Sequence, residues 1–283
     1  LQDLPNFDFI CLHGIWSWIS DENRAAILDF IDSKLNVGGV VYISYNTLPG
    51  LGQIIPLREM LFNHFDKLSG PDEEIDTRIE RSKDYVASLI KVSAKFFEVN
   101  SDAKKRFDSL ANKNSNYLAH EYFNRDWKPM SFGQLSDFLE SAKLTYCCSA
   151  NFLDNVDAIN MTEEQIELLS KFKNTVQKET TRDIMYNQGF RRDYWVKGPT
   201  SLSKSESQRE LNKTSVIMKN DPSTFDYKVK GYQGMASLNE NIYKAVLNEI
   251  PYGKILKIGE ICTKVQKISK FQRSQVLESL YVL

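Results

Sequence analysis

Apolar positions near the start of the chain follow the order strand, helix, strand. Residues 7–12 form a short apolar run bounded by turn residues, which predicts a buried strand. Apolar residues then recur at helical spacing from Ser20, which suits an N-cap, to the Gly38-Gly39 pair, and this predicts an amphipathic helix. Residues 40–45 are β-branched and aromatic and predict a second buried strand. The tight connections indicate a βαβ unit with parallel strands.

Helical spacing replaces this pattern in the middle of the chain. Residues 53–110 hold amphipathic stretches without a strand-like run, which predicts a helical insertion. A helix over residues 130–144 and a strand over residues 144–152 then return the chain to the α/β layer. A further helix is predicted near residues 162–186.

The C-terminal third divides at a polar stretch. Residues 198–221 are rich in Ser, Lys, Asn and Pro and form the best linker candidate in the chain. Beyond residue 238, three short helical segments suggest part of a helix-turn-helix or winged-helix unit. The lysines around Lys267 would suit DNA contact, but charge runs usually face solvent, so nucleic-acid binding is disfavoured.

Composition limits the classes of protein to which the chain can belong. With 42% hydrophobic and 26% charged residues over 283 positions, the sequence is globular and long enough for about two domains. The 36 basic and 37 acidic residues leave a net charge of −1, which gives no electrostatic argument for a nucleic-acid or membrane partner. No apolar run approaches about 18 residues and no signal-peptide pattern occurs, so we expect a cytoplasmic protein without a membrane span.

The cysteines and the first residue give two further expectations. All four cysteines lie in mostly apolar runs without metal-ligand spacing, so we expect buried free thiols and no metal site. The chain starts at Leu1 rather than Met and enters a strand almost at once, which suggests a truncated parent.

Two loops that follow the predicted strands form the candidate site. The first contains His13, Gly14, Trp16 and Trp18, and the second covers residues 46–50. Ligands of open parallel sheets bind beyond the carboxyl ends of the strands, so we expect both loops on one rim of the sheet. Their aromatic and amide side chains suit a nucleoside base and a small polar group, although the two tryptophans, taken alone, favour a role as core anchors.

Three segments resemble a known family. In chain order, FDFICLHGIWSWI, LNVGGVVYISYNTLPG and LAHEYF resemble the middle of class I S-adenosylmethionine-dependent methyltransferases that carry a methyltransferase regulatory domain. The most similar group is the bacterial protein-lysine methyltransferases that act on outer-membrane proteins. The resemblance covers residue 1 to about residue 200 and is most specific in the HGIWSW and SYNTLPG segments.

The resemblance implies a fold. It makes residues 7–12 and 40–45 the fourth and fifth strands of the methyltransferase sheet. It also places the family's glycine-rich loop before residue 1, and no G-x-G-x-x-G motif occurs in this sequence. We expect an α/β fold: a partial Rossmann-like class I methyltransferase sheet with a helical insertion and a mainly helical, winged-helix-like C-terminal part. The expected division is residues 1–52 for the C-terminal half of the core, 53–128 for the regulatory insertion, 129–197 for the return to the core and the following helix, 198–237 for a linker, and 238–283 for an incomplete helical domain.

The resemblance also implies residue roles. Methyl transfer needs a neutral amine aligned with the S–CH3 bond, so Tyr45 and Asn46 would accept the amine protons while His13 orients or deprotonates the amine. Capping of loop backbone is the open alternative for His13 and Asn46. The implied cofactor contacts are His13, Gly14, Trp16 and Trp18, and the implied substrate contacts are Asn46, Thr47, Pro49, His120 and Glu121. For His120 and Glu121 a capping or interface role is favoured over a metal pair, because adjacent helical residues cannot both face one point.

The implied function is S-adenosylmethionine-dependent protein-lysine methylation. As a fragment, the chain would bind this cofactor only if the missing N-terminal half is supplied. The implied partner is a protein substrate, with an outer-membrane protein before its export as the candidate. Two alternatives stay open: a catalytically inactive substrate-docking or regulatory module, and a helix-turn-helix DNA-binding regulator.

Overall fold

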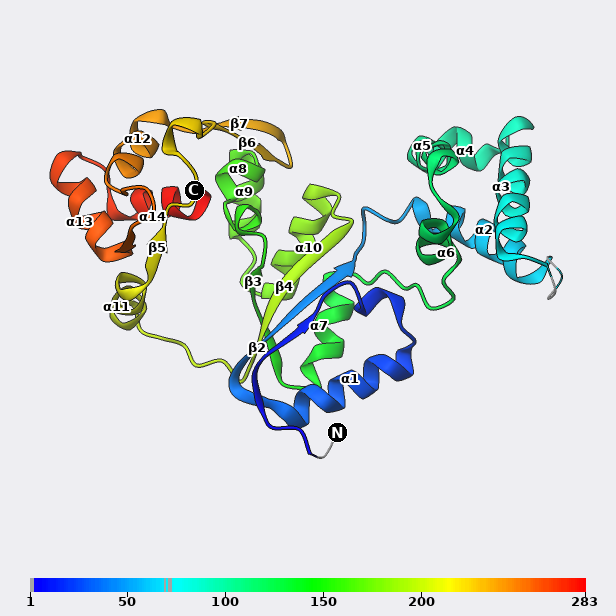
Figure 1. Cartoon of the computed structure of the whole chain (residues 1–283), viewed down its shortest axis with the longest axis horizontal. Helices are drawn as coiled ribbons and strands as arrows, with labels where there is room; N and C mark the ends of the chain where they lie inside the picture. Colours follow the sequence, from blue (N-terminus) through cyan, green and yellow to red (C-terminus); the bar gives the residue numbers. More distant parts are fainter. Residues whose placement is uncertain (1–2, 69, 71–72) are drawn as a thin grey trace.

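A four-stranded mixed sheet forms the centre of the protein in a computed structural model, which describes residues 3–68, 70 and 73–283. The strand order is β1-β2-β4-β3 (Figure 1). Strands β1 (Phe7–Leu12) and β2 (Leu35–Asn46) are parallel, and β4 (Phe190–Lys197) runs antiparallel to both β2 and β3 (Leu144–Ser149). The expected α/β class is therefore confirmed.

The predicted βαβ unit is present, but its helix ends earlier than expected. A 3-10 turn, η1 (Trp16–Trp18), precedes helix α1 (Asp21–Lys34), whose N-cap Ser20 accepts a hydrogen bond from the Asn23 N–H. The chain is already extended at Leu35, and Gly38 and Gly39 lie inside β2. Gly38 has φ +82°, near the point where the register between β1 and β2 shifts. The glycine pair thus accommodates a strand irregularity rather than ending the helix.

Helices pack on one face of the sheet. Helices α1, α7 (Phe132–Glu140) and α10 (Thr175–Tyr186) lie on the face to which β2 contributes alternate residues (Figure 1). The core there includes Trp16, Leu28, Ile31, Val41, Ile43, Tyr45, Phe132, Leu135, Leu139 and Trp195. On the opposite face Phe9 is 53% exposed, and its ring contacts that of Tyr194. The two faces of the sheet are thus covered unequally.

The helical insertion predicted after the second strand is present and has its own core. It contains α2 (Ile54–Lys67), α3 (Ile75–Lys91), α4 (Lys95–Val99), α5 (Ser101–Asp108), η2 (Ser109–Asn112) and α6 (Ser115–Phe123). Apolar side chains of these helices, such as Leu57, Ile79 and Leu118, pack together. The insertion returns to the sheet where Thr47 and Met130 form a parallel bridge.

The segment predicted as a linker contains secondary structure. Between residues 198 and 237 the structure has α11 (Lys204–Lys213), β5 (Ser215–Ile217), η4 (Pro222–Thr224), and the hairpin of β6 (Lys228–Gly231) and β7 (Gly234–Ser237). None of the described residues of α11 is buried, which agrees with the polar composition that favoured a linker. The division into domains stays a prediction.

The C-terminal part is mainly helical. Helices α12 (Glu240–Asn248), α13 (Ile258–Ile268) and α14 (Arg273–Val282) pack around Val246, Ile261 and Val276, and β8 (Ile255–Lys257) pairs with β5. The remaining elements, η3 (Phe152–Asn155), α8 (Asp157–Asn160) and α9 (Glu163–Ser170), lie between β3 and α10. In the part of the chain that the structure describes, no helix has the length and apolar character to cross a membrane.

The cysteines differ from the expectation. All four are free thiols, as predicted, but Cys11 and Cys147 are exposed and only Cys262 is buried. Cys11 and Cys147 lie on β1 and β3, the two edge strands, at positions that no helix covers. The apolar surroundings in the sequence did not reveal which face of each strand these residues occupy.

Candidate functional site

The two predicted loops lie side by side on one rim of the sheet. Because β1 and β2 are parallel, their carboxyl ends meet at the same edge. The Asn46 N–H donates to Ser17 Oγ at 2.8 Å, and the Gly14 N–H donates to Ser44 Oγ at 2.7 Å. Both bonds join β2 to the loop that follows β1, and the predicted geometry is confirmed. We call residues 13–18 and 46–50 the rim loops.

His13 is the most accessible polar side chain of the first rim loop. Its ring stacks on Tyr42 with centroids 5.9 Å apart, and its Nδ1 lies 3.1 Å from the Tyr42 hydroxyl. Tyr42 and Asn46 lie on the same side of β2, because alternate residues of a strand share a face. An exposed imidazole and a half-buried amide thus border the same edge of the open face.

The two tryptophans of this loop have different environments. Trp16 is fully buried in the core, where its ring packs edge-on against Phe138. Trp18 is half-buried, and its ring centroid lies 4.7 Å from that of His120 in α6. The structure therefore gives Trp16 the anchoring role and leaves Trp18 at the rim, where it meets the helical insertion.

Three other predicted site residues have structural contacts. Tyr45 is 1% exposed, lies on the helix-covered face, and donates its hydroxyl to Asp193 at 3.0 Å. Its phenol is thus directed away from the open face on which Asn46 lies. Thr47 is fully buried and donates its hydroxyl to the Met130 carbonyl at 2.8 Å, whereas Pro49 is exposed.

The insertion contributes the last two predicted residues. His120 is exposed and lies 3.4 Å from Glu121, measured between Nδ1 and Oε1. His120 contacts the first rim loop through Trp18. Neighbouring Trp127 lies 6.3 Å from Trp18 and stacks under the guanidinium of Arg58, whose pKa burial lowers to about 10. An interface between the insertion and the rim is therefore present.

The second rim loop packs against the turn that enters β4. The Gly50 N–H donates to the Gln188 carbonyl at 2.8 Å, and a Cβ on Gly50 would lie 2.4 Å from the Asn187 carbonyl oxygen. Only glycine permits this approach. Gly50 of the SYNTLPG segment therefore holds the second rim loop against the turn that leads into β4.

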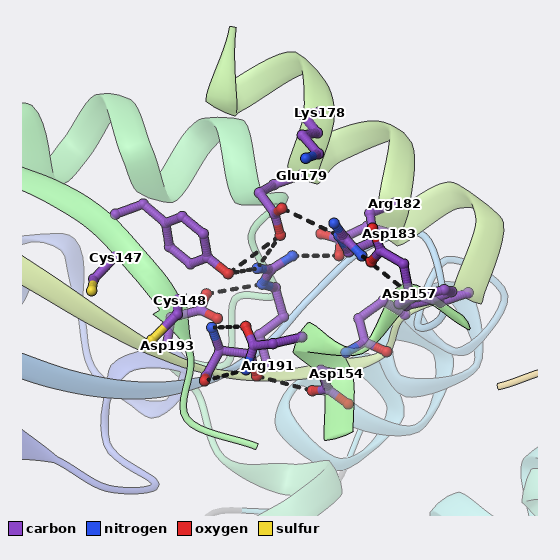
Figure 2. A pocket seen from close by; sticks show the side chains of 15 residues that line it. Cys147, Cys148, Asp154, Asp157, Lys178, Glu179, Arg182, Asp183, Arg191 and Asp193 are labelled. Atoms are coloured by element: carbon purple, nitrogen blue, oxygen red, sulfur yellow. Dashed lines mark hydrogen bonds and ion pairs between the residues drawn. The ribbon is translucent and has the colours of Figure 1, made fainter. Parts of the chain in front are cut away.

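A buried ionic cluster at the start of β4 was not predicted as a site. Arg191 donates to Asp193 at 2.8 Å, to Asp183 at 2.5 Å and to Glu179 at 3.0 Å, with its guanidinium over the Phe132 ring at 4.6 Å. Figure 2 shows these carboxyl side chains around Arg191, and the cluster borders a cavity of about 230 Å³. We call Arg191, Asp193, Asp183 and Glu179 the Arg191 cluster.

Burial dominates the electrostatics of this cluster. It raises the pKa of Asp183 to about 7, despite the neighbouring Arg191, with Asp193 and Glu179 adding to the rise. Burial also raises the pKa of Asp193, which Arg191 opposes. The structure buries Arg191 under α10 and leaves Arg192 exposed on the other face of β4.

The rim offers S-adenosylmethionine only part of a site. Gly14 has φ +66° with open space where a Cβ would stand, and the loop backbone there is free to approach a ligand. No glycine-rich loop of the G-x-G-x-x-G type occurs in the sequence to hold the remainder of such a cofactor. The rim residues thus fit one side of the cofactor and not the whole of it. Among the described residues, no group of three or more His, Cys, Asp or Glu side chains is arranged to hold a metal ion.

Comparison with known families identifies part of the chain. Residues 114–197 match the family model described as a predicted methyltransferase regulatory domain. The resemblance to methyltransferases with this domain is confirmed. The matched region starts in α6 and extends through β3 and β4, whereas the resemblance places the regulatory insertion at residues 53–128.

Relatives with similar sequences are longer than this chain. An uncharacterised protein of Synechocystis sp. is 37% identical over 280 residues, which cover 99% of this chain and 54% of that protein. An uncharacterised protein of Rickettsia prowazekii is 24% identical over 221 residues, covering 75% of this chain and 37% of that protein. The chain spans about half or less of the length of these curated relatives.

The fold is similar to that of a solved structure. PKMT2 from Rickettsia typhi aligns with a TM-score of 0.62 and 18% identity, over the whole of this chain and 57% of that one. Its complex with AdoHcy gives the same TM-score and identity, over 99% of this chain and 56% of that one. At this identity the likeness establishes the fold alone.

Proposed function

We propose that this chain is part of an S-adenosylmethionine-dependent protein-lysine methyltransferase and that the rim loops present the substrate amine. The observation that carries this proposal is that the two rim loops lie side by side beyond parallel strands, joined by the hydrogen bond from the Asn46 N–H to Ser17 Oγ. The regulatory-domain match and the AdoHcy complex of the structural neighbour support it. The proposed substrate is a protein, with an outer-membrane protein methylated in the cytoplasm before export as the candidate.

The rim residues have roles that suit amine alkylation. S-adenosylmethionine, when bound, supplies an electrophilic methyl group on a sulfonium sulfur. His13 accepts a proton from the lysine ammonium, which frees the lone pair that forms the new N–CH3 bond as the S–CH3 bond breaks and S-adenosylhomocysteine leaves. The Asn46 side-chain oxygen accepts a remaining N–H and orients the amine. Tyr42, in contact with His13 Nδ1, positions the imidazole.

A second candidate is a catalytically inactive substrate-docking module. The absence of a G-x-G-x-x-G sequence from these 283 residues favours this alternative for the chain by itself. In that case the rim loops stabilise the sheet and bind no cofactor.

Calorimetric titration with S-adenosylmethionine separates the two candidates. With the remainder of the methyltransferase core supplied, the methyltransferase proposal predicts saturable heat in the micromolar range that is lost in His13→Ala and retained in Lys104→Ala, a change of an exposed residue in α5. A titration without heat, together with no transfer of tritiated methyl to a lysine-rich protein, would establish the docking module instead.

A further inference from the structure

The cavity beside the Arg191 cluster has no role in the proposed methyl transfer. It lies at the carboxyl end of β3 and the start of β4, under α10. Since β3 runs parallel to β1 and β2, the cavity occupies the same edge of the sheet as the rim loops. Two strand spacings, about 10 Å, separate β4 from β1, so a group bound in the cavity is not the amine at His13.

The side chains that line the cavity include more carboxyl groups than cationic groups. Five carboxyl groups face three cationic groups; these are Asp154, Asp157, Glu179, Asp183 and Asp193 against Lys178, Arg182 and Arg191. Asp183 Oδ2 and Asp193 Oδ1 are buried and have no hydrogen-bond partner among the described residues. Their side chains are only 3% and 1% exposed. Buried carboxylate oxygens without donors are costly, so a cationic donor at this wall would stabilise them.

The size and ligand types of the cavity favour an organic cation. A protein cavity of about 150 Å³ can hold benzene, so about 230 Å³ accommodates an ammonium or guanidinium group with part of its stem. The described carboxyl groups are not arranged as a metal site. Aliphatic stems with charged tips are the property of lysine and arginine side chains.

An apolar groove adjoins the cavity. It has a volume of about 760 Å³ and shares Cys148, Asn155 and Asp157 with the cavity wall. Its walls include Phe152 of η3 and Tyr281 of α14, which are 61% and 50% exposed and whose rings lie 6.5 Å apart. Exposed aromatic side chains around a groove are typical of protein-binding surfaces.

We propose that the cavity and the groove together bind a protein segment in which a lysine or arginine stands next to apolar residues. The cationic side chain enters the cavity and pairs with its carboxyl groups, and the apolar neighbours pack against Phe152 and Tyr281. This proposal rests on the proposed function, because it names the chemistry of a docking segment in the methylated protein.

Direct peptide binding tests the proposal without methyl transfer. The probe is a fluorescein-labelled nonapeptide with a central lysine flanked by leucine and phenylalanine, measured by fluorescence anisotropy at low salt with the full chain. We expect saturable binding that weakens about tenfold when the lysine is replaced by norleucine, since a hydrogen-bonded ion pair is lost.

Two charge variants locate the binding site. Lys178→Glu adds negative charge to the cavity wall and should tighten binding about fivefold. Lys173→Glu makes the same change on an exposed residue away from the wall, just before α10, and should leave the affinity within about twofold. Phe152→Ser, on an exposed side chain, should weaken binding about fivefold through the groove.

Three outcomes would overturn the proposal. The first is equal affinity for the lysine and norleucine peptides, and the second is equal effects of Lys178→Glu and Lys173→Glu. The third is no peptide binding by a chain that is folded, as its cooperative thermal unfolding would show. Each leaves the methyltransferase proposal standing, because S-adenosylmethionine titration reports on the rim loops independently.

Discussion

The rim loops and the Arg191 cluster lie at one edge of the same sheet but are built in opposite ways. The rim loops are fixed by short bonds between serine side chains and loop backbone, and they leave His13 exposed. The Arg191 cluster is buried, and its charges are satisfied mostly by one another across α10 and β4. Tyr45 joins β2 to the cluster through Asp193.

The contrast shows that the accessible polar groups and the buried stabilising charges lie in different regions of the sheet edge. A site that handles a substrate amine needs exposed polar groups on a fixed backbone, which the rim provides. A buried network of one arginine and three carboxyl groups fixes the position of α10 on the sheet but depends on every partner being present. The two regions should therefore respond differently to mutation and to pH.

Removal of the arginine should have the largest effect on stability. Arg191→Met leaves three buried carboxyl groups without their common cation, and we expect a loss of about 3–5 kcal/mol in the free energy of unfolding. Urea denaturation measures the loss. Arg192→Met, on the adjacent exposed position, is the matched control and should change stability by at most about 0.5 kcal/mol. Equal effects of the two changes would show that the cluster is not a stabilising network.

The cluster should also carry a pH dependence. The folded pKa of Asp183, about 7, lies above the unfolded value of about 3.9, so its ionisation is more costly in the folded chain. The contribution of protonated Asp183 to the free energy of unfolding is therefore full at low pH and is lost as pH rises towards 7. Arg191, Arg182, Glu179, Asp193 and Tyr146 are the charged or titratable groups around it.

Asp183→Asn tests this linkage, because asparagine mimics the protonated carboxyl group at every pH. Between pH 5 and 7, the unfolding free energy of the variant relative to the unmodified chain should rise by about 1 kcal/mol per pH unit. A difference that does not change with pH would contradict the raised pKa.

A smaller effect is expected at the base of the rim. Ser17→Ala removes the acceptor of the Asn46 N–H, and Ser17 is 1% exposed, so about 1–2 kcal/mol should be lost. Thermal unfolding measures the change. Ser33→Ala, an exposed serine in α1, should change stability by less than about 0.5 kcal/mol; an equal loss there would argue against a specific role for Ser17.

The smallest effect on stability belongs to the residue with the largest proposed role. His13 is exposed, so His13→Ala should cost no more than about 0.5 kcal/mol while removing the cofactor-dependent heat described above. Tyr42→Phe keeps the stacked ring and loses only the hydroxyl beside Nδ1, so a partial loss of that heat is expected. A large destabilisation by His13→Ala would instead assign His13 a structural role.

The sequence predicts the rim better than the cluster for a physical reason. The rim depends on local signals, namely two apolar runs and the glycine and proline of the loops, and these gave the parallel strands and their shared edge. Strand β4 was missed because its buried face carries Arg191, Asp193 and Lys197, which conceal the period-two alternation of FRRDYWVK. Only the tertiary contacts with α10 make charged residues acceptable there.

The same limits apply to individual site residues. Hydropathy could not separate Trp16 from Trp18, since only the packing of Phe138 against the first and of His120 against the second distinguishes them. Tyr45 belongs with the buried alternation of Val41 and Ile43, a pattern that is visible in the sequence and argues against a position on the open face.

Chemical-shift mapping of the isotope-labelled chain with S-adenosylhomocysteine tests the central claim most directly. With the remainder of the methyltransferase core supplied, titration should perturb the backbone amides of Gly14 and Asn46 and the indole N–H of Trp18, and should leave the Arg191 side-chain resonance unchanged. Perturbations confined to the Arg191 cluster, or none at the rim loops at saturating ligand, would contradict the assignment of the rim as the site of methyl transfer.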